Sequence, residues 1–151
     1  MAKSNTNSFS VCDAGESDYE VNVLGYFRRQ AFLRFIGAEP VRVLPGSCTL
    51  QLKSREDLAG DSTGFHPGAM GALAVGAGEC AALTLLPPEA TLSLLEDKLN
   101  LFAPAAGDVL VASAKVIKSS DTATVCMAEV YVRRDQSRNL CAVALMTFVS
   151  G

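Results

Sequence analysis

Apolar residues are densest between His66 and Pro88, where they do not alternate with polar residues as they would in a half-buried strand. This segment predicts one long helix that is apolar on all sides and therefore buried. Pro67 suits the first turn of a helix, and the pair Pro87-Pro88 is expected to end it. Glu79 near the middle argues against a membrane span, because a carboxylate is costly in lipid. The many small residues of the helix indicate that another backbone approaches it closely.

The rest of the chain predicts strands packed around this helix. Four segments after Pro88 alternate between apolar and polar residues, which predicts an antiparallel meander. A strand pair or one bent strand is expected earlier, within residues 41–53, with a turn at Pro45-Gly46. The expected fold is α+β, with a curved antiparallel sheet of five to six strands wrapped around one long central helix. The four later strands are expected at residues 91–102, 109–118, 123–132 and 140–149.

The first part of the chain predicts less structure. Residues 1–24 are polar and expected to be loose, which leaves a single domain over residues 25–151. Apolar residues between Gly25 and Ile36 follow helical spacing, so a shorter helix is expected there. Its phenylalanines, Phe32 and Phe35 among them, are expected to face the core.

Composition and charge narrow the classes of function. The chain has 151 residues, of which 49% are apolar, and a net charge of −3, so we expect a globular domain without nucleic-acid partners. The five cysteines are widely spread and form no C-x-x-C pair, which predicts reduced thiols, a cytoplasmic location and no metal site. The N-terminus lacks the apolar stretch of a secretory signal, and no membrane partner is expected.

Three motifs occur in a recognisable order. His66-Pro67-Gly68 opens the helix, Leu73-Ala74 follows within it, and residues 101–108 (LFAPAAGD) form a strand end and turn. In this order and spacing the chain resembles the hotdog-fold acyl-CoA thioesterases of the phenylacetic acid type over roughly residues 32–149. The resemblance implies a homodimer or a homotetramer that is a dimer of dimers, with sites at the subunit interface. It also implies an acyl-CoA ligand and no cofactor besides coenzyme A as part of the substrate.

The same resemblance implies a mechanism, from which this sequence departs twice. In the family, a glycine N–H at the helix start polarises the thioester carbonyl, and a carboxylate nine residues after the histidine attacks or activates water. Here Pro67 has no N–H, which leaves Gly68 as the donor, and Val75 stands at the position of the carboxylate. Glu79, one helical turn after Val75, is the candidate replacement. A buried carboxyl group is expected to have a raised pKa, which suits a general base.

Each of these residues also has a structural interpretation. His66, the single histidine, is expected either to brace the helix start by hydrogen bonding or to contact the thioester. Glu79 has a purely structural alternative, hydrogen-bonded across a dimer or to His66, Lys98 or an arginine. Asp61, in the loop before His66, can cap the helix, hold water or simply be solvated. If Glu79 is only a buried hydrogen-bonding residue at a dimer interface, the protein is a dimeric structural protein.

Further residues are candidates for binding the substrate. Val75 shares a helical stripe of small residues with Glu79, and Ser93 lies on the strand where relatives contact the acyl group. Arginine and lysine suit the phosphates of coenzyme A. The competing hypothesis is a non-catalytic module that binds acyl-CoA or another acyl ligand, as the departures at Pro67 and Val75 suggest. The cationic candidates, each with a solvated alternative, are Lys118, Arg133 and Arg134, with Lys115 and Arg138 beside them.

Overall fold

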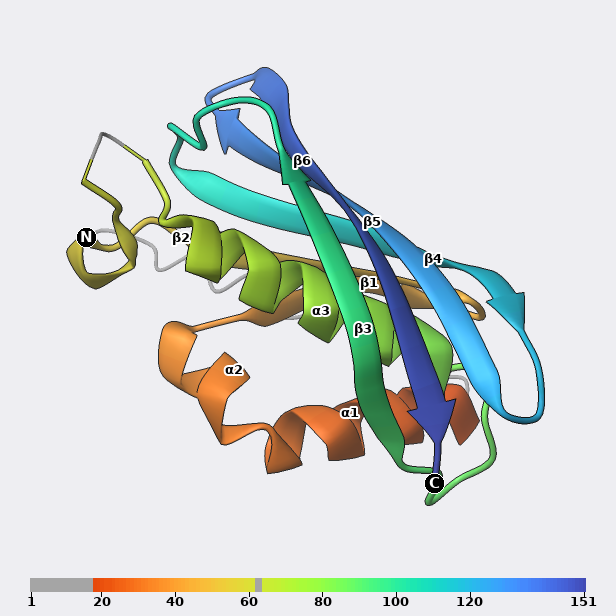
Figure 1. Cartoon of the computed structure of the whole chain (residues 1–151). Helices are drawn as coiled ribbons and strands as arrows, with labels where there is room; N and C mark the ends of the chain where they lie inside the picture. The colour runs from red at the N-terminus through yellow and green to blue at the C-terminus, as the bar shows by residue number, and fades with distance from the viewer. Residues whose placement is uncertain (1–17, 62–63) are drawn as a thin grey trace, which may run out of the picture.

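An antiparallel sheet of six strands dominates the computed structural model, which describes residues 18–61 and 64–151 (Figure 1). The helix α3 (Pro67–Leu83) packs against strands β2, β4, β5 and β6, and the sheet curves across it. The predicted fold class is therefore confirmed. The strands are β1 (Glu39–Leu44), β2 (Ser47–Lys53), β3 (Leu92–Leu101), β4 (Val109–Ser119), β5 (Ala123–Arg134) and β6 (Ser137–Ser150), in the order β1-β2-β4-β5-β6-β3.

The strand order differs from the predicted meander in one place. Strands β4, β5 and β6 follow one another, but β3 pairs with β6, with Leu92 opposite Ser150 and Leu101 opposite Ala142. The prediction that β3 begins the meander was therefore wrong, and β3 forms an edge of the sheet. Alternation of apolar residues identifies a strand but does not identify its neighbour, and consecutive strands are adjacent only in about two-thirds of cases.

Two short helices, α1 (Asp18–Arg29) and α2 (Ala31–Ile36), lie against α3. The expectation of a loose segment over residues 1–24 is wrong for residues 18–24, which are helical and include the buried Val23. The remainder of that segment lies outside the described residues. Burial of one apolar stripe stabilises α1, so its polar composition does not prevent it from folding.

Two phenylalanines of α2 face away from the core, contrary to the prediction, whereas Ile36 is buried. The chain bends at Gln30, where φ is −82° and ψ is 85°, so α1 and α2 do not form one continuous helix. As a result Leu33 is buried, whereas Phe32 and Phe35 are 59% and 73% exposed. The predicted core positions for these two phenylalanines were wrong. Their spacing assumed one continuous helix, and the bend at Gln30 turns a different face of α2 toward the core.

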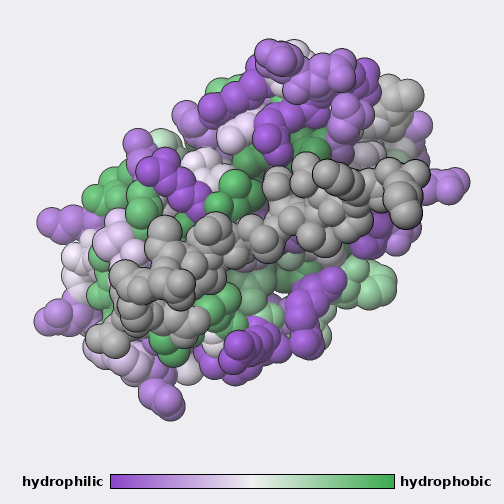
Figure 2. Space-filling model, turned by 180° about the vertical axis from the view of Figure 1, so that it is seen from behind, coloured by the Kyte–Doolittle hydropathy of each residue, from purple (hydrophilic) through white to green (hydrophobic). Residues whose placement is uncertain are grey.

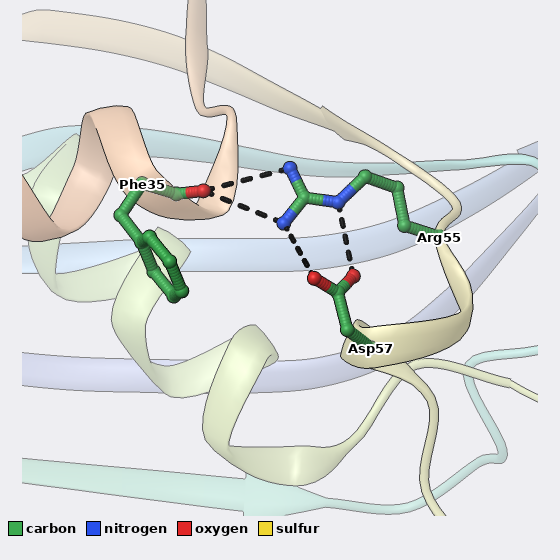
Figure 3. Close-up of polar contacts among 3 residues, drawn as sticks. All are labelled: Phe35, Arg55 and Asp57. Atoms are coloured by element: carbon green, nitrogen blue, oxygen red, sulfur yellow. Dashed lines mark hydrogen bonds and ion pairs between the residues drawn. The ribbon is translucent and has the colours of Figure 1, made fainter.

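An exposed ion pair fastens the end of α2 to the loop that precedes α3 (Figure 3). The guanidinium group of Arg55 donates to both carboxylate oxygens of Asp57, at 3.0 and 3.1 Å. It also donates to the carbonyl oxygen of Phe35, at 3.5 and 3.4 Å. A cation at the carbonyl end of a helix is favourable because this end carries partial negative charge. The contact attaches the end of α2 to this loop.

The helix α3 ends earlier than predicted. It stops at Leu83, although its expected stop was the pair Pro87-Pro88. After Leu83 the chain continues as a tighter turn, in which the N–H groups of Leu85 and Leu86 donate to carbonyls three residues earlier, and Pro87 follows this turn. The next residue, Thr84, donates its hydroxyl to the carbonyl of Ala81 and accepts the N–H of Gly46, at 2.6 and 2.7 Å. The β1–β2 turn is thereby attached to the end of α3.

At two glycines of α3 the nearest atoms of other elements belong to side chains, rather than to the closely approaching backbone that was predicted. A Cβ added at Gly76 would lie 2.9 Å from Cδ1 of Leu33, on α2. One added at Gly78 would lie 2.8 Å from Cε of Met146, on β6. These separations are shorter than van der Waals contact, so a larger residue at either position would force the end of a flexible neighbouring side chain to move.

The surface combines polar and apolar residues. On the face behind the view of Figure 1, apolar side chains reach the surface among hydrophilic ones (Figure 2). Exposed apolar residues of this kind are common in folded proteins. In the described ranges, no helix has both the length and the apolar character needed to cross a membrane.

Candidate functional site

A groove of about 250 Å³ lies between α3 and the two N-terminal helices. Most of its lining is apolar, and three polar side chains contribute to it. A mostly apolar hollow with a few polar groups is the usual form of a small-molecule site. The lining residues are Tyr26, Gln30, Phe32 and Leu33 on the side of α1 and α2, and Gly71, Ala72, Val75, Gly76 and Glu79 on α3.

Glu79 is the charged residue of this groove, and a tyrosine holds its carboxylate. The hydroxyl of Tyr26 donates to Oε2 of Glu79 at 2.8 Å. Burial raises the pKa of Glu79 above its usual range, and the hydrogen bond from Tyr26 partly offsets this increase. Burial and the charge of Glu79 both raise the pKa of Tyr26, so this hydroxyl remains protonated and continues to donate.

No cation balances the Glu79 carboxylate among the described residues. The ion pairs there are Arg55–Asp57, Arg134–Asp108 and Arg138–Glu129, all on the surface. The predicted structural partners of Glu79 within the chain, His66, Lys98 or an arginine, are therefore replaced by Tyr26. Within the same ranges, no group of three His, Cys, Asp or Glu side chains is placed to hold a metal ion.

A histidine caps the start of α3. His66 is the N-cap residue, and its Nδ1 accepts the N–H of Gly68 at 2.9 Å. Its carbonyl oxygen accepts the N–H groups of Ala69 and Met70, at 2.9 and 3.3 Å. His66 therefore braces the helix start, and the N–H of Gly68 becomes available to a ligand only if the imidazole turns away.

The two parts of the predicted catalytic set lie far apart within one chain. Gly68 and Glu79 are separated by 79 − 68 = 11 residues of α3. At a rise of about 1.5 Å per residue, they are about 16 Å apart along the helix axis. One thioester carbonyl cannot contact both groups of a single chain. Joint action would require the donor of one subunit and the carboxylate of another.

The remaining predicted site residues are dispersed, apart from Val75, which lines the groove with Glu79. Asp61 is exposed in the loop before α3, and Ser93 is exposed on the edge strand β3. In the β4–β5 register Lys118 lies opposite Val125, whereas Arg133 lies opposite Val109. These cations are thus eight residues of β5 apart, about 27 Å at roughly 3.4 Å per residue. They do not form one phosphate site in a single chain.

Arg133 and Arg134 have polar neighbours of their own at the β5–β6 turn. Arg133 donates to Oε1 of Gln51 at 3.0 Å, and Arg134 lies 3.9 Å from the carboxylate of Asp108. A wider hollow of about 650 Å³ lies near the other end of β5, between residues 85–90 and the β4–β5 turn. It contains none of the predicted site residues, so the smaller groove at Glu79 is the better candidate.

Sequence reasoning missed Tyr26, which is the direct partner of Glu79. A signal was present in the spacing of Val23, Tyr26 and Phe27, because positions i, i+3 and i+4 share one helical face. All three are buried. The polar composition of the preceding residues concealed this stripe, and nothing in the sequence indicated that it packs beside Glu79.

Comparisons with known proteins agree with the fold. No family model matches the sequence, and no curated protein is significantly similar to it. Among solved structures, a thioesterase family protein from Silicibacter pomeroyi is 29% identical, with a TM-score of 0.85 over 87% of this chain and 97% of that one. The E. coli PaaI protein, from the phenylacetic acid degradation operon, is 16% identical, with a TM-score of 0.77 over 87% and 92%. A Haemophilus influenzae thioesterase is 18% identical, with a TM-score of 0.75 over 90% and 91%. The chain is therefore a hotdog-fold protein and a structural relative of thioesterase-family proteins.

Proposed function

We propose that the protein is an acyl-CoA thioesterase in which Glu79 is the general base. The observation that carries this proposal is a half-buried carboxylate of raised pKa in an apolar groove, held by Tyr26 and paired with no cation among the described residues. A raised pKa brings a carboxyl group nearer to neutral pH, where a general base accepts a proton most effectively. The apolar lining suits an acyl group, and the thioesterase-family neighbours support the reaction class.

The proposed step is the hydrolysis of a thioester by water. The Glu79 carboxylate takes a proton from water while the water oxygen bonds to the thioester carbon. The C–S bond then breaks, the thiolate of coenzyme A leaves, and the proton held by Glu79 passes to it. Direct attack by the carboxylate, through an anhydride that water hydrolyses, has the same overall balance.

The oxyanion donor in this proposal is the N–H of Gly68 in a partner subunit. The distance of about 16 Å along α3 makes a homodimer, or a dimer of dimers, necessary for the two groups to meet. His66 must then turn away from Gly68 when the carbonyl binds. We also propose that Arg133 and Arg134, both exposed at the end of β5, contact the phosphates of coenzyme A.

The proposed location is the cytoplasm. Four cysteines in the described ranges are buried and unpaired, as expected in a reducing compartment. No resident cofactor is required by the proposed chemistry, because the carboxylate, a water molecule and backbone N–H groups supply all of its parts.

The second candidate function is a non-catalytic module that binds an acyl ligand. The occupied N–H of Gly68 favours it, because an oxyanion donor that already has a partner contributes nothing to catalysis. The departures at Pro67 and Val75 point in the same direction. In this case the groove binds ligand while Glu79 and Tyr26 serve only to satisfy each other.

The test is thiol release from acetyl-, hexanoyl-, palmitoyl-, phenylacetyl- and benzoyl-CoA. The wild type is compared with Glu79→Gln and with Glu56→Gln, an exposed glutamate outside the groove. We expect turnover by the wild type and by Glu56→Gln, and a fall of about 10²- to 10⁴-fold in Glu79→Gln, the range for losing a general base. No turnover with any ester, together with a raised melting temperature in their presence, would support the binding module.

A further inference from the structure

We propose that Tyr26 is a positioning residue for the Glu79 carboxylate, holding Oε2 so that Oε1 remains for water or ligand in the groove. The proposal rests on the proposed function of Glu79. Its geometric basis is the 2.8 Å hydrogen bond from the Tyr26 hydroxyl to Oε2. Among the described residues no other hydrogen bond to this carboxylate occurs, so Oε1 has no protein partner there.

Tyr26 is fixed by the packing of α1. Its side chain is 5% exposed, between the buried Val23 and Phe27. The rings of Tyr26 and Phe27 meet edge to face, with centroids 5.8 Å apart. One turn earlier, the side-chain amide of Asn22 donates to the carbonyl of Leu86 at 3.1 Å, which attaches α1 beyond the end of α3. The hydroxyl is therefore held by the fold at a constant place beside the groove.

Glu79 by contrast has little that fixes it on its own helix. The other residues that α3 contributes to the groove are glycines, an alanine and a valine, namely Gly71, Ala72, Val75 and Gly76. Such short side chains leave a glutamate free to adopt several rotamers. The hydrogen bond to Tyr26 selects among them. A misplacement of a reacting group by about 1 Å can lower the rate by about 10²-fold, so positioning is a major source of rate enhancement.

In the part of the chain that the structure describes, no other hydrogen bond or ion pair to Glu79 takes the place of Tyr26. The thiols of Cys80, on α3, and Cys48, on β2, are buried, and burial raises the pKa of Cys80, which keeps it neutral. The cations of α1 and α2 are exposed, and none is ion-paired with Glu79 in the described part of the chain. These cations are Arg28, Arg29 and Arg34.

The experiment replaces the hydroxyl and keeps the ring. Tyr26→Phe is compared with the wild type and with the control Tyr131→Phe, whose ring lies on β5 under the guanidinium of Arg138, 3.7 Å away. Two quantities are measured: kcat and KM for the best acyl-CoA as a function of pH, and the titration of the Glu79 carboxyl group by ¹³C NMR, assigned with Glu79→Gln. Circular dichroism confirms that each variant is folded.

We expect Tyr26→Phe to lower kcat by about tenfold or more, the effect of losing a hydrogen bond to a charged group, with a smaller change in KM. The hydrogen bond favours the ionised carboxylate, so its loss moves the acid limb of the profile and the NMR titration to higher pH. Tyr131→Phe should change neither quantity. A purely structural tyrosine would lower the melting temperature without moving the titration.

Two outcomes would overturn the proposal: a Glu79 titration in Tyr26→Phe that matches the wild type, or an unchanged kcat. If the wild type hydrolyses no thioester, the proposed function fails separately, and the NMR titration alone decides whether Tyr26 controls the carboxylate. If Tyr26→Phe does not fold, a fluorotyrosine at position 26 replaces it. Its more acidic hydroxyl is a stronger donor, so the titration should move to lower pH, and no movement would contradict the proposal.

Discussion

The start and the middle of α3 both carry groups suited to thioester chemistry, but the hydrogen-bond partners of these groups differ in their separation along the sequence. At the start, the N–H of Gly68 is bound by His66, two residues away. In the middle, the carboxylate of Glu79 is bound by Tyr26, 53 residues away. The hydrogen bond between Gly68 and His66 forms with the helix itself, whereas the hydrogen bond between Tyr26 and Glu79 forms only when α1 packs against α3.

This difference has a chemical consequence. All three N–H groups of residues 68–70 are occupied by atoms of His66, so the helix start is complete without a ligand. Glu79 has one oxygen bound and lies half-buried in a groove. The carboxylate in the middle of α3 can therefore accept a proton without rearrangement, whereas the N–H of Gly68 at its start must first lose its bond to His66.

Removing the groove wall should have the largest effect on stability. Leu33 is 4% exposed and its Cδ1 lies beside Gly76, so Leu33→Ala leaves a cavity between α2 and α3. We expect a loss of about 2–4 kcal/mol in the free energy of unfolding, measured by denaturant titration. The amide resonance of Gly68 should not change if the two ends of α3 are independent.

Phe35→Ala is the matched control on the same helix, because Phe35 is 73% exposed. We expect it to change the free energy of unfolding by about 0.5 kcal/mol or less. Equal losses in the two variants would show that α2 does not pack as described.

Removing the cap at the helix start should have a smaller effect and tests the role of His66. His66→Ala loses the acceptor for the N–H of Gly68, and we expect a loss of about 1 kcal/mol, as for other N-cap residues. His66→Asn, which can still cap, should recover most of it. Because the change frees the proposed oxyanion donor, kcat/KM for the best acyl-CoA should stay within about twofold of the wild type. A collapse of kcat/KM in both variants would instead mean that His66 contacts the thioester.

The smallest effect concerns the dependence of stability on pH. Burial raises the pKa of Glu79 in the folded state above its unfolded value, so ionising Glu79 opposes folding. Its contribution to stability is complete below the unfolded pKa and is lost as pH rises through the folded pKa. The free energy of unfolding of the wild type should therefore fall relative to that of Glu79→Gln as the pH rises above the usual pKa of a glutamate. A difference in the free energy of unfolding between the wild type and Glu79→Gln that does not change with pH would contradict the desolvation of Glu79.

Structural features that depend on residues close together in the sequence were the ones that could be predicted from it. Alternating residues predicted the strands, and Pro45-Gly46 predicted the turn between β1 and β2, because these features depend on neighbouring residues. The dense small residues predicted a buried α3. Placing Glu79 and Val75 on one helical stripe needed only the helical repeat, and both line the groove.

The amino-acid sequence by itself determined that a curved antiparallel sheet would cover one apolar helix, since periodicity and turn residues act locally. The tertiary structure alone decided that β3 pairs with β6, that Leu33 rather than Phe32 faces the core, and that Tyr26 binds Glu79. Each of these pairs residues far apart in the chain. The free energy of such contacts depends on how complete elements fit together, and no local pattern of residues encodes that fit.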